Sequence, residues 1–127
     1  MNRELDKLEW YRKGYELYNP SYDTIAKIKK RISVYLIEVV IDLECKDVHY
    51  LIPKLFKTLY MCEVNHCATY SVNFKNLPAI INSKTIIKTP TIIFTKSDKE
   101  HFRITEKLVH TSTIENEIEI LLSRNQL

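Results

Sequence analysis

The first third of the chain has the hydrophobic pattern of two amphipathic helices. Over residues 1–18 apolar side chains recur at helical spacing, with charged residues between them. Asn19-Pro20 ends this helix, because proline cannot continue one, and Ser21 is a suitable N-cap for a second, shorter helix. The apolar positions of the two helices are Leu5, Leu8, Tyr11 and Tyr15, then Ile25, Ile28 and Ile32.

The middle of the chain changes from a strand pattern to a helix pattern and back. Val34–Ile41 is an apolar run rich in β-branched residues, which predicts a central strand covered on both faces. Residues 48–59 return to helical spacing, with Pro53 inside, where we expect a kink. Residues 62–72 alternate between apolar and polar side chains, which predicts a second strand.

The last third predicts a short helix, a β-hairpin and a closing helix. The short helix starts near Asn76, and Ser112 with Glu115 forms a capping-box pattern for the closing one. A β-α-β half joined to a β-β-α half predicts an α/β fold with a four-stranded mixed sheet and helices on both faces. The hairpin strands are Thr91–Phe94 and Phe102–Thr105, joined by the turn Ser97-Asp98-Lys99.

Composition excludes several classes of protein. With 127 residues, of which 45% are hydrophobic and 28% charged, the chain is expected to form one globular domain, residues 1–127. No apolar run approaches the ~20 residues that span a bilayer, and the charged N-terminus is no secretory signal. A net charge of +3 is too small to indicate a nucleic-acid partner.

The numbers of cysteines, histidines and glycines indicate the compartment and exclude several kinds of cofactor site. Three cysteines, an odd number, favour a reducing compartment, so we expect a cytoplasmic protein. The four histidines lack the paired spacing of a zinc site, and no metal or other cofactor is expected. Gly14 is the only glycine, which excludes the glycine-rich loops of P-loop and dinucleotide-binding enzymes.

Three local features resemble the thioredoxin-like fold. Cys45 directly follows the central strand at the start of the long helix, and Pro53 lies eight residues later. Thr89-Pro90 leads into the first hairpin strand. The resemblance implies a thioredoxin-like core over residues 33–124, with residues 1–32 as a helical extension. It also implies that Cys45 occupies the position of the nucleophilic cysteine and that Pro90 is a cis-proline.

The active turn departs from the dithiol pattern. Its sequence is Cys45-Lys46-Asp47-Val48, so Val48 replaces the second cysteine, which would resolve a mixed disulfide. Dithiol cycling inside this motif is therefore excluded. Two interpretations of Cys45 stay open, a functional thiol or a residue kept for structure. Cys62 and Cys67, expected on opposite faces of one strand, are interpreted as core thiols, with a remote resolving role for one of them as the alternative.

Two functions follow from this resemblance. The first is a binding or scaffold module, in which the backbone of Thr89 at the cis-proline groove pairs with an extended protein or peptide partner. The alternative is a monothiol thiol-disulfide oxidoreductase in cell redox homeostasis, with Cys45 as the nucleophile and a small thiol such as glutathione resolving the mixed disulfide. The aromatic residues of the first helix are expected to pack on the sheet, with a homodimer surface as the alternative.

Overall fold

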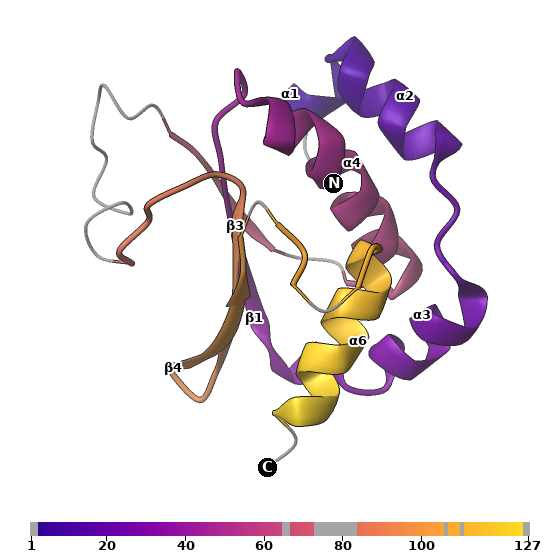
Figure 1. The fold of residues 1–127 in the computed structure, drawn as a ribbon, viewed down its shortest axis with the longest axis vertical. Coiled ribbons are helices and arrows are strands. Elements are labelled where there is room, and N and C mark those ends of the chain that lie inside the picture. Colours follow the sequence, from indigo (N-terminus) through magenta and orange to yellow (C-terminus); the bar gives the residue numbers. More distant parts are fainter. Residues whose placement is uncertain (1–2, 65–66, 73–83, 106, 110, 126–127) are drawn as a thin grey trace.

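The computed structural model describes residues 3–64, 67–72, 84–105, 107–109 and 111–125. The N-terminal helices lead into the first strand, and a long helix separates that strand from the second (Figure 1). The hairpin and the closing helix follow. In chain order the elements are α1 (Arg3–Asp6), α2 (Glu9–Leu17), α3 (Tyr22–Lys29), the 3-10 turn η1 (Ile32–Val34), β1 (Leu36–Ile41), α4 (Lys46–Met61), β2 (Ala68–Ser71), β3 (Thr91–Lys96), β4 (Lys99–Ile104) and α6 (Ile114–Arg124).

The four strands form one mixed sheet in the order β2-β1-β3-β4. β2 runs parallel to β1, whereas β3 is antiparallel to both of its neighbours, β1 and β4. The predicted α/β class and the four-stranded mixed sheet are therefore confirmed. The helices of the described residues lie on one side of this sheet (Figure 1). The short helix expected near Asn76 lies outside the described residues.

Strand β1 is buried on both faces, as its apolar run predicts. Ile37, Val39 and Ile41 belong to the main core, which the sheet forms with α4, α6 and the N-terminal helices. Val40 belongs to a smaller cluster on the second face of the sheet. The members of that smaller cluster are Val40, Val72, Ile86 and Ile93.

Helix α4 continues through Pro53, and α2 packs against it at that point. Gly14 of α2 lies so close that a Cβ atom there would be 2.8 Å from both Cβ and Cγ of Pro53. A separation below 3.0 Å is not tolerated without movement. Close helix packing thus explains the only glycine of the chain.

The aromatic residues of α2 pack on α4, as the Tyr11–Phe56 contact shows. The expectation that they pack on the sheet is therefore wrong.

The prediction of a single helix over residues 1–18 is wrong. The chain turns at Lys7 and Leu8, where the Lys7 N–H donates to Glu4 O and the Leu8 N–H to Leu5 O. Leu8 has extended backbone angles and stands before α2. The apolar spacing continues across the turn because Leu5 and Tyr11 reach the same core, so periodicity alone could not detect it.

Other element boundaries also shift. β1 begins at Leu36 rather than Val34, because the preceding residues form η1. In the described part of the alternating segment 62–72, the strand covers Ala68–Ser71. Cys62 instead ends α4, donating its N–H to the carbonyl oxygens of Thr58 and Tyr60. The expectation that Cys62 and Cys67 share a strand is therefore wrong.

The N-cap residue predicted from the sequence is confirmed for α3 and is wrong by one residue for α6. Ser21 caps α3 as predicted, its Oγ accepting from the Thr24 N–H at 3.4 Å. For α6 the cap is Thr113, not Ser112, and its hydroxyl accepts from the Asn116 N–H. The two hydroxyl residues are adjacent and equally suitable as caps, so the sequence pattern alone does not choose between them.

Candidate functional site

Two segments distant in the sequence meet where the central strands β1 and β3 end and begin. Cys45 is the residue before α4, shortly after β1 ends, and Thr89 stands just before β3. Because β1 and β3 are antiparallel neighbours, with Val40 opposite Thr91, the end of one lies beside the start of the other. The Cys45 thiol donates a hydrogen bond to the Thr89 carbonyl oxygen at 3.4 Å. The Thr89–Pro90 peptide bond is cis, as expected.

The residues of this turn differ in their exposure to solvent. Cys45 is partly exposed, whereas Thr89 is only 6% exposed and Pro90 is buried. Lys46 and Asp47 are exposed at the start of α4. A molecule that approaches the turn therefore meets the thiol and the first helical turn before it reaches the backbone of Thr89.

Backbone and side-chain hydrogen bonds fix the position of Cys45. Its N–H donates to Asp42 O at 3.0 Å, and its carbonyl accepts from the His49 N–H at 3.2 Å. The Asp42 side chain accepts from the Glu44 N–H at 3.0 Å, which closes the loop between β1 and α4. The cysteine is thus held at the helix N-terminus by local contacts that serine would also permit.

The N-terminal extension contributes to the surroundings of the turn, which sequence reasoning missed. Trp10 of α2 stacks on His49, with ring centroids 4.1 Å apart and planes at 28°. His49 Nε2 lies 2.6 Å from Leu43 O, in the loop before Cys45. No spacing in the sequence relates Trp10 to His49, because the contact depends on how α2 crosses α4.

No second thiol stands beside Cys45, although all three cysteines are among the described residues. Val48, at the position of a resolving cysteine, is fully buried. Cys62 lies at the opposite end of α4, about 24 Å along a helix of 16 residues. Burial raises the pKa of Cys62 to about 11 and also raises that of Cys67, so both are poor nucleophiles at neutral pH.

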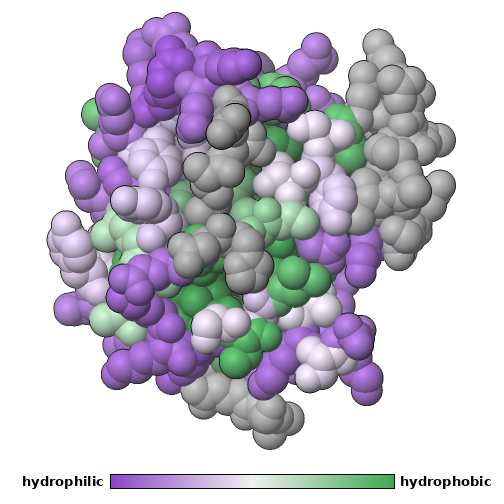
Figure 2. Space-filling view, turned by 180° about the vertical axis from the view of Figure 1, so that it is seen from behind, coloured by the Kyte–Doolittle hydropathy of each residue, from purple (hydrophilic) through white to green (hydrophobic). Residues whose placement is uncertain are grey.

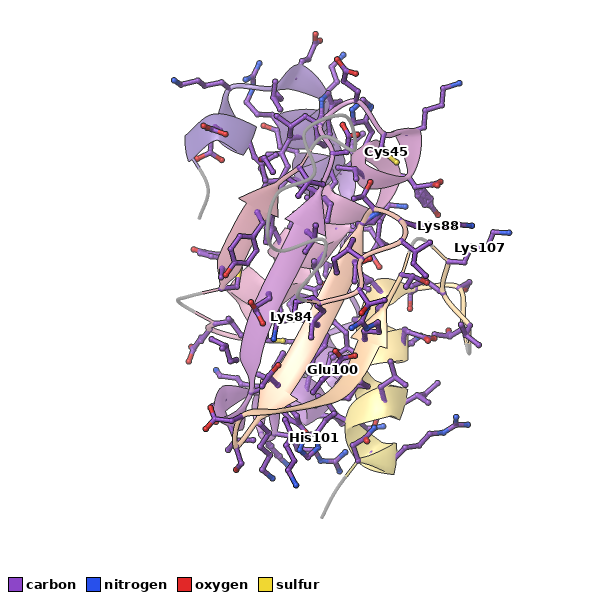
Figure 3. All side chains as sticks on the ribbon, turned by 90° about the vertical axis from the view of Figure 1, so that its left-hand side faces the viewer. Cys45, Lys84, Lys88, Glu100, His101 and Lys107 are labelled. Atoms are coloured by element: carbon purple, nitrogen blue, oxygen red, sulfur yellow. The ribbon has the colours of Figure 1, made fainter. Side chains whose placement is uncertain are left out.

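A cavity of about 390 Å³ opens beside the first turn of α4. Its lining mixes apolar, hydroxyl and charged groups from α4 and from the loop between β4 and α6. Figure 3 shows Lys88 and Lys107 projecting on the side of the molecule where Cys45 lies. The lining residues are Asp47, Tyr50, Leu51, Lys107, Leu108, Thr111 and Ser112.

Glu38 does not belong to this turn. It is buried in β1 and opposite Ile93 of the second-face cluster. Tyr70 donates to its carboxylate at 3.3 Å, and Lys84 Nζ lies 3.7 Å from it. Lys84 is therefore paired with a carboxylate of the second face, whereas Lys46 is exposed beside Cys45.

The described residues contain no cluster of metal-binding side chains. No three histidine, cysteine, aspartate or glutamate side chains among them come together as a metal site. In the same part of the chain, no helix combines the length and apolar character needed to cross a bilayer.

Comparison with known proteins gives a likeness of fold alone. No protein-family model matches the chain, and no curated protein matches it. A solved structure, a protein of unknown function from Pseudomonas aeruginosa, is similar with a TM-score of 0.68 and 12% sequence identity. The match covers 97% of this chain and 84% of that chain. At such identity the likeness supports the α/β architecture and carries no function.

Proposed function

We propose that this chain is a thioredoxin-like protein without dithiol activity, which binds an extended peptide at the turn formed by Cys45, Thr89 and Pro90. The fold part of the proposal is supported by the β-α-β and β-β-α arrangement around α4. It is also supported by the placement of Cys45 before α4 and of Pro90 before β3. These are the positions that the resemblance assigns to the two residues.

The observation that carries the proposal is the 3.4 Å contact between Cys45 Sγ and the Thr89 carbonyl oxygen. This contact places the partly exposed thiol beside the backbone that is expected to pair with a peptide, so the two form one site. An incoming peptide N–H would take the place of the thiol as donor to this carbonyl. Anything bulky attached to Cys45 would then exclude the peptide.

The surroundings favour binding over dithiol chemistry. Buried Val48 leaves no resolving thiol one helical turn away, and Cys62 lies at the far end of α4. A Cys45 mixed disulfide would therefore have no thiol of this chain beside it. The proposed module accordingly retains the groove and has no internal resolving step.

The experiment selects a peptide from a displayed library of random extended sequences and measures its affinity before and after N-ethylmaleimide treatment. Alkylation of Cys45 is expected to weaken binding at least tenfold. The matched control is Cys45→Ser treated identically, which lacks the reactive thiol and is expected to keep its affinity. The proposal is overturned if no peptide is selected, or if alkylation leaves the affinity of the wild type unchanged.

A second candidate is a monothiol thiol-disulfide oxidoreductase, favoured by the partial exposure of Cys45 beside the 390 Å³ cavity. The Cys45 thiolate would attack the glutathione sulfur of a mixed disulfide between glutathione and another thiol. A bond then forms between Cys45 and that sulfur, the disulfide bond of the substrate breaks, and the other thiol leaves as the reduced thiolate. A second glutathione thiolate would attack the glutathione sulfur of the mixed disulfide and release Cys45.

Turnover of bis(2-hydroxyethyl) disulfide with glutathione tests this candidate. Catalysis above the uncatalysed rate that disappears in Cys45→Ser and persists in Cys67→Ser would establish the monothiol enzyme. A rate equal to the uncatalysed one for the wild type would exclude it and leave the binding module.

A further inference from the structure

A second cavity lies away from the Cys45 turn, between the N-terminal helices and the C-terminal part of α4. Its volume is about 290 Å³. Tyr60, on its α4 side, is about 21 Å along the helix from Lys46 at the other end. The cavity is lined by Asp6, Tyr11, Arg12, Tyr15, Glu16 and Tyr60.

Three tyrosine rings surround this cavity at different depths. Tyr11 is only 3% exposed and contacts Phe56, with ring centroids 6.2 Å apart, which fixes its ring from behind. Tyr15 is half-buried, and its ring centroid lies 5.8 Å from that of Tyr11. Tyr60 is 66% exposed and stands at the mouth. The cavity thus has an aromatic floor and one accessible aromatic wall.

The charged residues of the lining favour a cation over an anion. Two carboxylates, Asp6 and Glu16, against the guanidinium of Arg12 leave one net negative charge. Arg12 Nη1 donates to the backbone carbonyl of Asp6 at 2.9 Å, so hydrogen bonding holds it to the chain. Figure 2 shows mainly hydrophilic side chains over the end of the molecule formed by α1 and α2.

The phenols of Tyr11 and Tyr15 carry no charge at physiological pH. Burial, and after it the proximity of Tyr15 and Asp6, raises the pKa of Tyr11. Burial also raises the pKa of Tyr15. An anionic ligand would therefore meet two carboxylates against the one guanidinium of Arg12, whereas a cation would meet aromatic rings, whose faces attract positive charge through their quadrupole.

The protein already places one of its own cations on this aromatic group. Lys57 Nζ lies 5.4 Å from the centroid of the Tyr15 ring and donates to the Glu16 carbonyl at 3.5 Å. Lys57 is not part of the cavity lining, so this contact leaves the cavity itself open. The volume is at the lower end of ligand pockets, which suits a small head group rather than a large molecule.

We propose that this cavity binds a small organic cation, an alkylated ammonium group that contacts Tyr11, Tyr15 and Tyr60 and faces the carboxylates of Asp6 and Glu16. Ring faces receive the apolar, positively charged methyl groups, and the carboxylates supply the remaining attraction. This site is independent of the proposed peptide groove, because it shares no residue with the Cys45 turn.

Calorimetric titration of the full chain with choline chloride tests the proposal. The comparison ligand is 3,3-dimethyl-1-butanol, which has the same shape and no charge. Saturable choline binding at least tenfold tighter than that of the neutral ligand is the expected result. Equal affinity for the two, or no saturable choline binding, would overturn the proposal.

Variants at the mouth assign the binding to this cavity. Tyr60→Leu removes the exposed ring and is expected to weaken choline binding at least threefold, whereas Tyr60→Phe keeps the ring and the affinity. Tyr22→Leu, at a tyrosine of α3 that is 80% exposed, is the matched control and is expected to bind as the wild type does. If Tyr60→Leu also binds as the wild type does, the assigned cavity is wrong.

Discussion

Gly14 is a single residue on which the packing of two helices depends. In Gly14→Ala the added methyl group would overlap the ring of Pro53, which is rigid and buried. Because the overlap involves two atoms of a ring, we expect an overpacking cost near the upper end of about 1–3 kcal/mol. After the ~1 kcal/mol that alanine gains in helix propensity, the free energy of unfolding is expected to fall by about 1–2 kcal/mol. Urea unfolding measures the change.

Lys13→Ala is the matched control for this substitution. Lys13 is the neighbour of Gly14 in α2, and its side chain is 70% exposed in an ion pair with Glu9. A change of only a few tenths of a kcal/mol is expected there. Equal stability of Gly14→Ala and the wild type would mean that α2 and α4 are farther apart than described.

The ion pair between Glu100 and Arg103 makes the stability of the fold depend on pH. The guanidinium donates to both carboxylate oxygens at 2.6 Å and lowers the pKa of Glu100. The unfolded chain therefore binds this proton more readily than the folded one, so stability falls as pH drops below the ordinary Glu value. Arg103 also donates to the carbonyls of Lys84 and Thr85, so the pair holds the segment before Thr89.

We expect Glu100→Gln to flatten this dependence. Urea unfolding between about pH 7 and about pH 3 is expected to show the wild type losing more stability than the variant on the acid side. A wild-type and variant difference that stays constant over this range would show that the carboxylate has no lowered pKa in the folded state.

The separate residues of the candidate site could be predicted, but their surroundings could not. Cys45 and the cis Thr89-Pro90 bond were expected from the resemblance to the thioredoxin-like fold. The contact between Cys45 and Thr89 depends on the pairing of β1 with β3. The Trp10–His49 stack was missed because it depends on a helix crossing angle, which no local pattern encodes.

At the scale of elements, hydrophobic periodicity located strands and helices and misplaced their ends. It found β1, α4 and the hairpin, because each buries a continuous face. It failed at Leu8 and at Cys62, where the apolar spacing continues while the backbone changes direction. Helix α4 ends after Cys62, where the next residue, Glu63, has a φ of 62°, the left-handed conformation that commonly ends helices.

The hairpin turn gives a prediction at this scale. Ser97 and Asp98 both have positive φ, 53° and 63°, a conformation that two-residue hairpin turns require and that glycine adopts without strain. Asp98→Gly is expected to raise the free energy of unfolding by about 0.5–1 kcal/mol. Thermal unfolding measures it, with Asp98→Ala as the control that keeps the Cβ atom. A glycine variant no more stable than the alanine variant would contradict the turn geometry.

At the scale of the whole molecule, the N-terminal helices are joined to the C-terminal helix by polar contacts. Tyr18 donates to the buried carboxylate of Glu115, which also accepts the Ser21 N–H at 3.1 Å. Thr24 donates to Asn116 at 3.0 Å, beside this pair. These links tie residues 1–32 to the rest of the fold through groups far apart in sequence.

Tyr18→Phe removes one of these links without changing the shape of the ring. The buried Glu115 oxygen would lose its donor, so we expect a loss of about 1–3 kcal/mol in the free energy of unfolding. Tyr22→Phe, at an 80% exposed tyrosine, is expected to have no effect. If both variants unfold at the same urea concentration, the Tyr18–Glu115 bond does not stabilise the packing of α6.

The proposed site requires that the Cys45 thiol is accessible at a turn beside Thr89, whereas Cys62 is buried and burial raises the pKa of Cys67. Iodoacetamide labelling of the native protein across a range of pH, read by peptide mass spectrometry, tests it most directly. We expect Cys45 to be labelled first, and Cys62, 3% exposed, to resist labelling until the pH approaches its pKa of about 11. Labelling of Cys62 at neutral pH as fast as Cys45, or an unlabelled Cys45, would contradict the account.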